Sequence, residues 1–164
     1  MKSNPEFEVY RNLIELLEKN NWNVICASPP GGTDNRFRKC LFPRRITTSD
    51  DRGSRDELDI IVLKNNQLIL IECKPRLSQS LKHENALGES DYQKLNRIMI
   101  NSTPQILSEM LRQGTGMEIP IDLQIHLALG VGKIDQKIPE KITIFEVGDK
   151  NKVHPYGNLE DDFD

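Results

Sequence analysis

Apolar side chains recur every three or four positions between residues 5 and 21, and polar ones fill the opposite side of a helical wheel. Ser3-Asn4-Pro5-Glu6 supplies a capping residue and a proline suited to a first helical turn. We therefore predict an amphipathic, sheet-covering helix that ends near Asn20-Asn21. Its apolar half comprises Phe7, Val9, Tyr10, Leu13, Ile14, Leu16 and Leu17.

The most apolar part of the chain, within residues 57–74, consists of two runs that flank Asn65-Asn66. Such a pair favours a two-residue hairpin turn, because Asn tolerates the positive φ of primed turns. Cross-strand partners then have residue numbers with a constant sum, so Lys64 faces Gln67. Both strands are nearly continuous Ile, Leu and Val, which predicts a sheet covered on both faces.

Four charged residues stand at the open end of this hairpin. In the same register Asp59 faces Glu72, and Glu57 faces Lys74. Because side chains alternate along a strand, all four leave the sheet on one face. Opposed like charges are destabilising, and two buried carboxylates need compensation. A divalent cation with oxygen ligands supplies it, and the adjacent lysine then stands beside its water and a phosphate. The pattern indicates a phosphodiesterase site.

Other elements follow from weaker patterns. We predict strands over 22–27, a strictly alternating half-buried strand over 121–131 and a last strand over 141–147. Pro75 should end the second hairpin strand because it cannot donate to the ladder. We also predict a helix over 89–101 and a helix from Thr103-Pro104 to about Arg112 that is closed by Gly114. Residues 28–49 should form a loop with at most a short strand at 39–46, and residues 76–90 should be irregular. We expect His83 and His126 to be plain polar-side residues.

Composition limits the class of protein. The 164 residues predict one domain over 1–148 and a loose acidic tail over 149–164. A formal charge of −3 argues against indiscriminate nucleic-acid coating. No stretch has the length and apolarity of a membrane span or signal peptide, so we expect no membrane partner. The three scattered cysteines suit a reducing cytoplasm, and Cys73 should be a small core residue.

The order Asp59, hairpin, then Glu72-Cys73-Lys74 resembles the signature of the PD-(D/E)XK nuclease superfamily, the restriction-endonuclease-like fold. The sequence pattern Glu-Leu-Asp-Ile…Ile-Glu-Cys-Lys is most similar to nuclease domains of CRISPR-associated effectors activated by cyclic oligonucleotides. It also resembles nucleases related to Holliday-junction resolvases and archaeal-type restriction enzymes. The match covers the hairpin alone, and Leu58 stands where the superfamily's name has proline.

The resemblance implies an α/β fold with a restriction-endonuclease-like core, in which helices flank a central mixed sheet of about four to five strands. It implies that Asp59 and Glu72 ligate Mg²⁺ or Mn²⁺, helped by the backbone carbonyl of Cys73. It also implies that Lys74 orients or deprotonates water. Relatives often carry a helix glutamate that reaches the metal. Glu6 fits that role by its place on the apolar arc, although it fits a plain helix cap equally well.

Glu8 is the alternative to Glu6 as the helix carboxylate. Its Phe7-Glu8 sequence resembles that of relatives, but its side chain points to the polar side of the helix. Two further groups of residues are candidates for nucleic-acid contact, each against the alternative of a solvated surface. A basic run before the hairpin could hold phosphates, and in related nucleases the helix after Glu-x-Lys often places a Gln or Lys near the site. These candidates are Arg36, Arg38, Lys39, Arg44 and Arg45 in the run, and Gln93 and Lys94 on the helix.

The resemblance implies a metal-dependent endonuclease in prokaryotic defence or DNA processing, with DNA favoured over RNA. Relatives often work as dimers to cut both strands, so we expect a homodimer by analogy. A chain of this length leaves no room for the regulatory domain of many relatives, so we expect that the enzyme stands alone or that its regulator is a separate chain. The main alternative is a catalytically silent module that binds nucleic acid or a partner protein, and the complete Asp…Glu-x-Lys set argues against it. The least favoured alternative is an ordinary sheet with solvated charges at the end of the hairpin. Glu57 has no assigned role, and a salt link to Lys74 is its simplest explanation.

Overall fold

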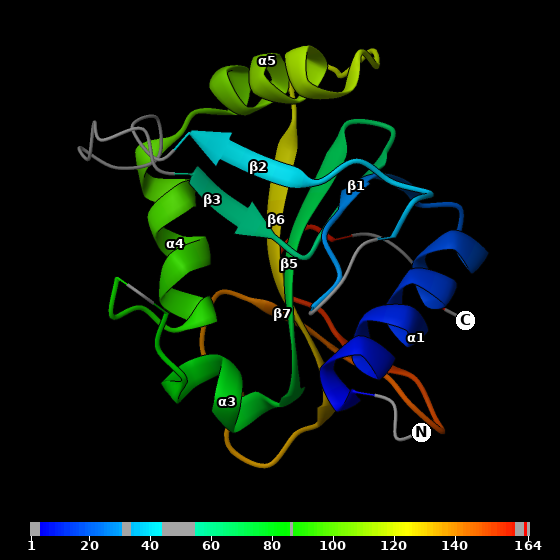
Figure 1. The fold of residues 1–164 in the computed structure, drawn as a ribbon, viewed down its shortest axis with the longest axis vertical. Coiled ribbons are helices and arrows are strands. Elements are labelled where there is room, and N and C mark those ends of the chain that lie inside the picture. The colour runs from blue at the N-terminus through cyan, green and yellow to red at the C-terminus, as the bar shows by residue number, and fades with distance from the viewer. Residues whose placement is uncertain (1–3, 31–33, 44–54, 86, 160–162, 164) are drawn as a thin grey trace.

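The computed structural model describes residues 4–30, 34–43, 55–85, 87–159 and 163. They form an α/β fold in which helices flank a mixed six-stranded sheet, with a two-stranded ribbon beside it (Figure 1). The helices are α1 (Pro5–Lys19), α3 (Leu77–Lys82), α4 (Asp91–Asn101) and α5 (Pro104–Thr115). The strands are β1 (Asn23–Ala27), β2 (Cys40–Pro43), β3 (Arg55–Leu58), β4 (Ile60–Lys64), β5 (Gln67–Arg76), β6 (Gln124–Lys133), β7 (Thr143–Glu146) and β8 (Lys152–His154).

The six-stranded sheet has the order β1-β4-β5-β6-β7-β8, and β2 and β3 form the separate ribbon. β5, β6 and β7 run parallel, whereas β1, β4 and β8 pair antiparallel to their neighbours. The sheet is thus larger than the four to five strands that the sequence predicts, because β8 is added at its edge. No helix in the described part of the chain combines the length and apolarity that a bilayer span requires.

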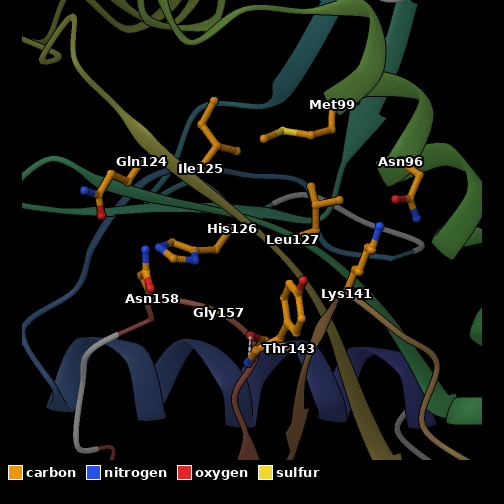
Figure 2. A pocket seen from close by; sticks show the side chains of 11 residues that line it. Asn96, Met99, Gln124, Ile125, His126, Leu127, Lys141, Thr143, Gly157 and Asn158 are labelled. Carbon is orange, nitrogen blue, oxygen red and sulfur yellow. Dashed lines mark hydrogen bonds between the residues drawn. The ribbon is translucent and has the colours of Figure 1, made fainter.

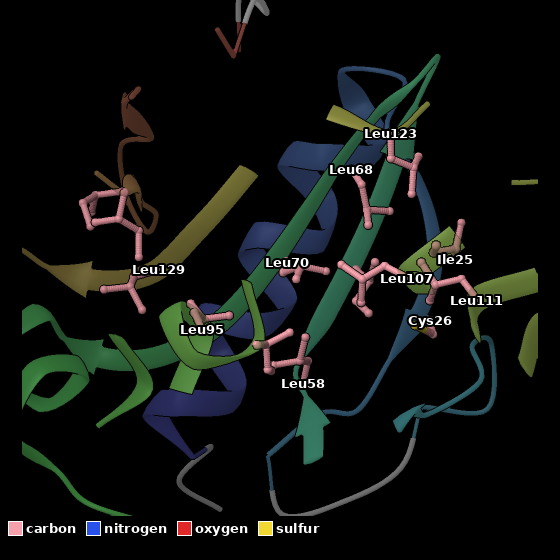
Figure 3. Close-up of a cluster of buried hydrophobic side chains, with 14 of the residues drawn as sticks. Ile25, Cys26, Leu58, Leu68, Leu70, Leu95, Leu107, Leu111, Leu123 and Leu129 are labelled. Carbon is pink, nitrogen blue, oxygen red and sulfur yellow. The ribbon is translucent and has the colours of Figure 1, made fainter. Parts of the chain in front are cut away.

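Two apolar clusters cover the two faces of the sheet. The buried face of α1 packs on one side, where it meets Ile69, Ile71 and Phe145. On the other side α4 and α5 pack over Leu68 and Leu70 of β5 (Figure 3). Because both faces are covered, the central strands are apolar at nearly every position.

The first helix confirms the amphipathic prediction. It begins at Pro5, where the side chain of Asn4 accepts the Glu6 N–H at 2.9 Å. Six of the seven predicted apolar residues are buried. Phe7, in the first turn, is the exception at 37% exposure, and its ring centroid lies 5.8 Å from that of the buried Tyr10.

The β4–β5 hairpin confirms the predicted turn and register. Lys64 pairs with Gln67, and the ladder continues regularly to Ile60–Ile71. Asn65 has a φ of 56°, the left-handed conformation that favoured Asn at this turn. The turn therefore sets which residues reach the far end of the hairpin.

Beyond Ile60 the expected pairing is wrong. Glu57 does not face Lys74, because the chain bends at Asp59 and residues 55–58 leave as β3. Glu57 instead pairs with Leu41 of β2. The predicted hairpin strand is therefore split between two sheets at Asp59.

The expected end of the strand at Pro75 is also wrong, since β5 continues to Arg76. Beyond Ile71 this strand has β6 as its sheet partner, and the pairing passes from Lys74–Val131 to Arg76–Lys133. Pro75 itself makes no ladder pair among the described residues, so its missing N–H disrupts nothing.

Other boundaries shift for local reasons. Residues 77–82, expected to be irregular, form α3. The cap of α5 is Gly116, with φ 71°, rather than Gly114. The alternating strand, β6, begins at Gln124 rather than Ile121 and lies inside the sheet; it is partly buried over residues 125–127, as expected, and fully buried over residues 128–131. Its α1-facing positions include Ala128 and Gly130, where a Cβ at Gly130 would lie 2.6 Å from Cδ2 of Leu13.

The segment after residue 148 differs from the loose tail that its acidic composition suggests. Residues 152–154 pair with β7 as β8. Leu159 is buried in the α1-side cluster, and the ring of Phe163 lies 5.2 Å from that of Phe145. Scattered apolar residues thus anchor this segment to the sheet.

Candidate functional site

A cavity of about 400 Å³ lies where β5 extends beyond the end of β4. The segment after β1, the bend at Asp59, the charged end of β5, the loop after α3 and the first turn of α4 all line it. Its charged lining includes Asp59, Glu72, Lys74, Asp91 and Lys94. The structure therefore brings the three residues of the Asp…Glu-x-Lys pattern together.

Two side-chain hydrogen bonds interlock Asp59 and Glu72. The N–H of Cys73 donates to Oδ2 of Asp59 at 2.7 Å. The N–H of Asp59 donates to Oε1 of Glu72 at 3.0 Å. Each carboxylate thus binds the opposing strand just where regular pairing has stopped. The bonds fix both side chains and leave Oδ1 of Asp59 and Oε2 of Glu72 for other contacts.

Burial makes negative charge costly for these two carboxyls. It raises the pKa of Asp59 to about 7. The hydrogen bond from the Cys73 N–H lowers this pKa, whereas the negative charge of Asp91 raises it further. Burial also raises the pKa of Glu72 well above its ordinary range, and the charge of Asp59 adds to this. Carboxyls with such pKa values gain from a bound cation.

Lys74 lies between two further carboxylates. Its Nζ is 3.2 Å from Oε1 of Glu6 and 3.1 Å from Oδ2 of Asp91. Burial disfavours the ammonium, but the charges of Asp91 and Glu6 outweigh that effect and raise the pKa of Lys74. Lys74 is therefore a fixed cation at neutral pH, which suits orienting a water or phosphate better than removing a proton.

The position of Glu6 distinguishes it from Glu8. Glu6 reaches Lys74 from the first turn of α1, whereas Glu8 pairs with Arg11 at 3.7 Å on the solvent side. Glu6 is therefore the helix carboxylate next to the site, and it contacts Lys74.

Lys94 and Gln93, the two candidates on α4, lie in different surroundings. Nζ of Lys94 lies 3.3 Å from Oε2 of Glu72 and donates to the backbone carbonyl of Glu57. Gln93 is exposed, and its Oε1 accepts the N–H of Ser90 in a capping box. Lys94 is thus in the site, and Gln93 holds the helix start.

Asp91, which the sequence patterns did not single out, lines the cavity, and so does His83, which was expected to be a plain polar-side residue. Asp91 is the first residue of α4, and the capping residue Ser90 was the available signal for its place. His83 is exposed and follows α3, which the sequence did not predict. Their positions depend on how α3 and α4 pack, which no local motif encodes.

The described part of the basic run lies apart from the cavity. Arg36 pairs with Asp34 at 3.2 Å, and Arg38 donates to the carbonyl of Gly114 at 3.3 Å. Lys39 is exposed. Arg44 and Arg45 are outside the described residues. Nucleic-acid contact by this segment stays a prediction.

An internal ion-pair network borders the site. Arg97 makes two hydrogen bonds to Asp56, at 2.8 and 2.9 Å, and two to Glu89, at 2.6 and 3.1 Å. The side chain of Asp56 is 2% exposed. This network ties β3 and the loop before α4 to the body of α4. Arg97 lies away from the buried positions Leu95 and Ile98 of α4, and strand β3, which supplies its partner Asp56, was not predicted from the sequence.

The donor set fits a hard divalent cation. The carboxyl groups of Asp59, Glu72 and Asp91 line the cavity together with the ammonium groups of Lys74 and Lys94, and Glu6 contacts Lys74 from α1. Within the described ranges, no three His, Cys, Asp or Glu side chains converge into a ready-made metal cage. Two carboxylates completed by waters are the minimal set that Mg²⁺ uses, and oxygen ligands also suit Mn²⁺.

A second cavity, of about 480 Å³, lies beside the first half of β6 (Figure 2). Amides, His126 and Lys141 line it together with apolar side chains, and no described carboxylate does. Burial lowers the pKa of His126. This cavity is larger than the acidic one, but it lacks the negative charge that would hold a dication.

Comparison of the chain with models of protein families, with curated proteins and with solved structures found no match.

Proposed function

We propose that this protein is a metal-dependent nuclease with a restriction-endonuclease-like core that hydrolyses phosphodiester bonds of nucleic acid, DNA in preference to RNA. One observation carries the proposal. The carboxylate of Asp59 accepts the N–H of Cys73, and the carboxylate of Glu72 accepts the N–H of Asp59, in a cavity that also holds the ammonium of Lys74. The Asp…Glu-x-Lys resemblance supports the same reading.

Asp59 and Glu72 would hold Mg²⁺ or Mn²⁺ through Oδ1 and Oε2, with the backbone carbonyl of Cys73 as a further ligand. When bound, such an ion polarises the scissile phosphate and acidifies water. The protein's own part is orientation, because the two backbone hydrogen bonds keep both carboxylates from turning away.

Lys74 would orient the attacking water and stabilise charge on the phosphate oxygens. Glu6 and Asp91 keep its ammonium charged and in place through the contacts at 3.2 and 3.1 Å. Both carboxylates are therefore positioning residues in this proposal. A proton released by the water must go to another group than Lys74.

The proposal extends to the setting of the enzyme. We infer a cytoplasmic homodimer that acts in prokaryotic defence or DNA processing. The free, buried thiols of Cys26 and Cys73 support a reducing compartment. The other inferences depend on the resemblance.

A catalytically silent, nucleic-acid-binding module is the second candidate. One observation favours it, since Lys94 contacts the Glu72 oxygen that a cation would use. Such a module would bind nucleic acid without cutting it.

The test is incubation of the purified protein with supercoiled plasmid, single-stranded DNA and RNA, each with Mg²⁺, Mn²⁺ or chelator. The proposal predicts cleavage of DNA with either metal and none with chelator. Lys74→Met should abolish it. Lys64→Met is the matched control, because Lys64 is half-buried at the turn end and donates to the carbonyl of Asn20. Binding of nucleic acid without Mg²⁺-dependent cleavage would favour the silent module, and cleavage by Lys74→Met would contradict the assigned role of Lys74.

A further inference from the structure

Lys94 and Glu72 form a shielded ion pair at the bottom of the acidic cavity. Nζ of Lys94 lies 3.3 Å from Oε2 of Glu72, and their side chains are only 12% and 6% exposed. The same ammonium also donates to the backbone carbonyl of Glu57. A pair with so little water around it is screened weakly, so its attraction is stronger than that of a surface pair.

Oε2 is the Glu72 oxygen that remains for a cation. The other oxygen, Oε1, accepts the N–H of Asp59 at 3.0 Å. A dication at Oε2 would therefore meet the ammonium of Lys94 at close range. Two cations so close repel each other strongly in a poorly hydrated cavity. Oε2 of Glu72 can therefore bind either the dication or the Lys94 ammonium at full strength, but not both at once.

The side chain of Lys94 is able to move its ammonium away from Oε2 of Glu72. It stands in the first turns of α4, whose start is fixed by the Ser90 hydroxyl accepting the N–H of Gln93. The backbone is thus held, while the four-carbon stem of a lysine has several rotamers. The cavity of about 400 Å³ that both residues line gives the ammonium room to turn toward water.

We propose that Lys94 is a positioning residue that serves as the internal counter-ion of Glu72 and competes with the divalent cation for Oε2. This role rests on the proposed function and differs from the phosphate contact that the sequence suggested. Lys94 holds the Glu72 carboxylate in its bound orientation and weakens metal binding. It therefore raises the metal concentration at which the site fills.

The test is titration of the metal-free protein with MnCl₂ in a calorimeter. The wild type is compared with Lys94→Met, which keeps the length of the side chain and removes its charge. We expect Lys94→Met to bind Mn²⁺ about tenfold more tightly, which corresponds to about 1.4 kcal/mol. Lys64→Met, the matched control at the other end of the hairpin, should bind Mn²⁺ as the wild type does.

The outcomes separate the two proposals. If the wild type binds Mn²⁺ and Lys94→Met binds it equally or more weakly, Lys94 does not compete and this inference is wrong. If neither binds Mn²⁺, the proposed function and this inference fall together. A purely structural role for Lys94 would lower the stability of the variant without increasing its affinity for metal.

A second measurement on the wild type covers the case that the variant does not fold. The ¹⁵N signal of the Lys94 ammonium should show slow exchange with water in the metal-free protein, because the group is held by two acceptors. Saturation with Mg²⁺ should shift that signal and speed its exchange. An unchanged signal at saturating Mg²⁺ would overturn the inference.

Discussion

The two ends of the β4–β5 hairpin are held together by different bonds. At the turn end, Asn65 makes the reversal and backbone pairing is regular. At the open end, pairing stops after Ile60–Ile71, and the carboxylates of Asp59 and Glu72 accept the backbone N–H groups instead. The candidate catalytic groups therefore also complete the sheet. A substitution at the open end should affect chemistry first, and one at the turn end should affect stability alone.

The largest effect is expected for Asp59→Asn. Its side-chain oxygen can still accept the Cys73 N–H, so the fold should remain, whereas the charge that would bind a cation is lost. We predict that plasmid cleavage falls by about 10²–10³-fold or more. Circular dichroism should give the wild-type spectrum. Cleavage within tenfold of the wild type would show that Asp59 is not a metal ligand.

The next effect concerns the network that anchors the open end. Arg97→Met removes the guanidinium from the buried carboxylate of Asp56 and from Glu89. Breaking a buried ion pair on one side costs about 3–5 kcal/mol. Urea denaturation should show that loss, and it should show less than about 1 kcal/mol for Lys64→Met, whose lysine is only half-buried. Equal losses would mean that the network is not the anchor of β3.

The pH dependence of stability should also distinguish the ends. Asp59 has a pKa of about 7 in the folded protein, against an ordinary 3.8. The folded state thus keeps a proton that the unfolded chain releases. The stabilisation is complete below pH 3.8 and is lost as the pH rises through about 7.

In chelator, this carboxyl should reduce the free energy of unfolding by at most about 1.4 kcal/mol per pH unit between pH 4 and 7. Urea denaturation at pH 5, 6 and 7 measures the slope. Asp59→Asn should have a shallower slope, whereas Asn65→Ala should keep that of the wild type. Identical slopes for all three proteins would mean that Asp59 keeps its ordinary pKa.

The smallest effect belongs to the turn. Asn65→Ala places a less tolerant residue at a φ of 56°, and we expect a loss of about 1–2 kcal/mol in unfolding free energy. The rate of plasmid cleavage should not change. A loss of cleavage in this variant would show that the two ends are coupled.

What the sequence could predict follows the same division. Asn65-Asn66 predicted the register of the hairpin correctly, because a two-residue turn fixes the pairing of the residues next to it. Glu57 was placed wrongly, since the bend at Asp59 and the pairing with β2 are not visible in a continuous apolar pattern. The place of Asp91 beside Lys74 depends on the packing of α4, which no short motif encodes.

The last part of the chain gives the complementary lesson. Its acidic residues suggest a loose tail, yet β8 pairs with β7. Leu159 and Phe163 are isolated in sequence and meet the α1-side core only after the sheet has formed. Composition describes the average of a segment, whereas a few apolar contacts decide whether it joins the core.

The most direct test of the central claim is anomalous diffraction from crystals soaked in MnCl₂. The account predicts an anomalous peak about 2.0–2.3 Å from Oδ1 of Asp59 and from Oε2 of Glu72. A peak at other residues, or none in the acidic cavity at saturating Mn²⁺, would contradict it.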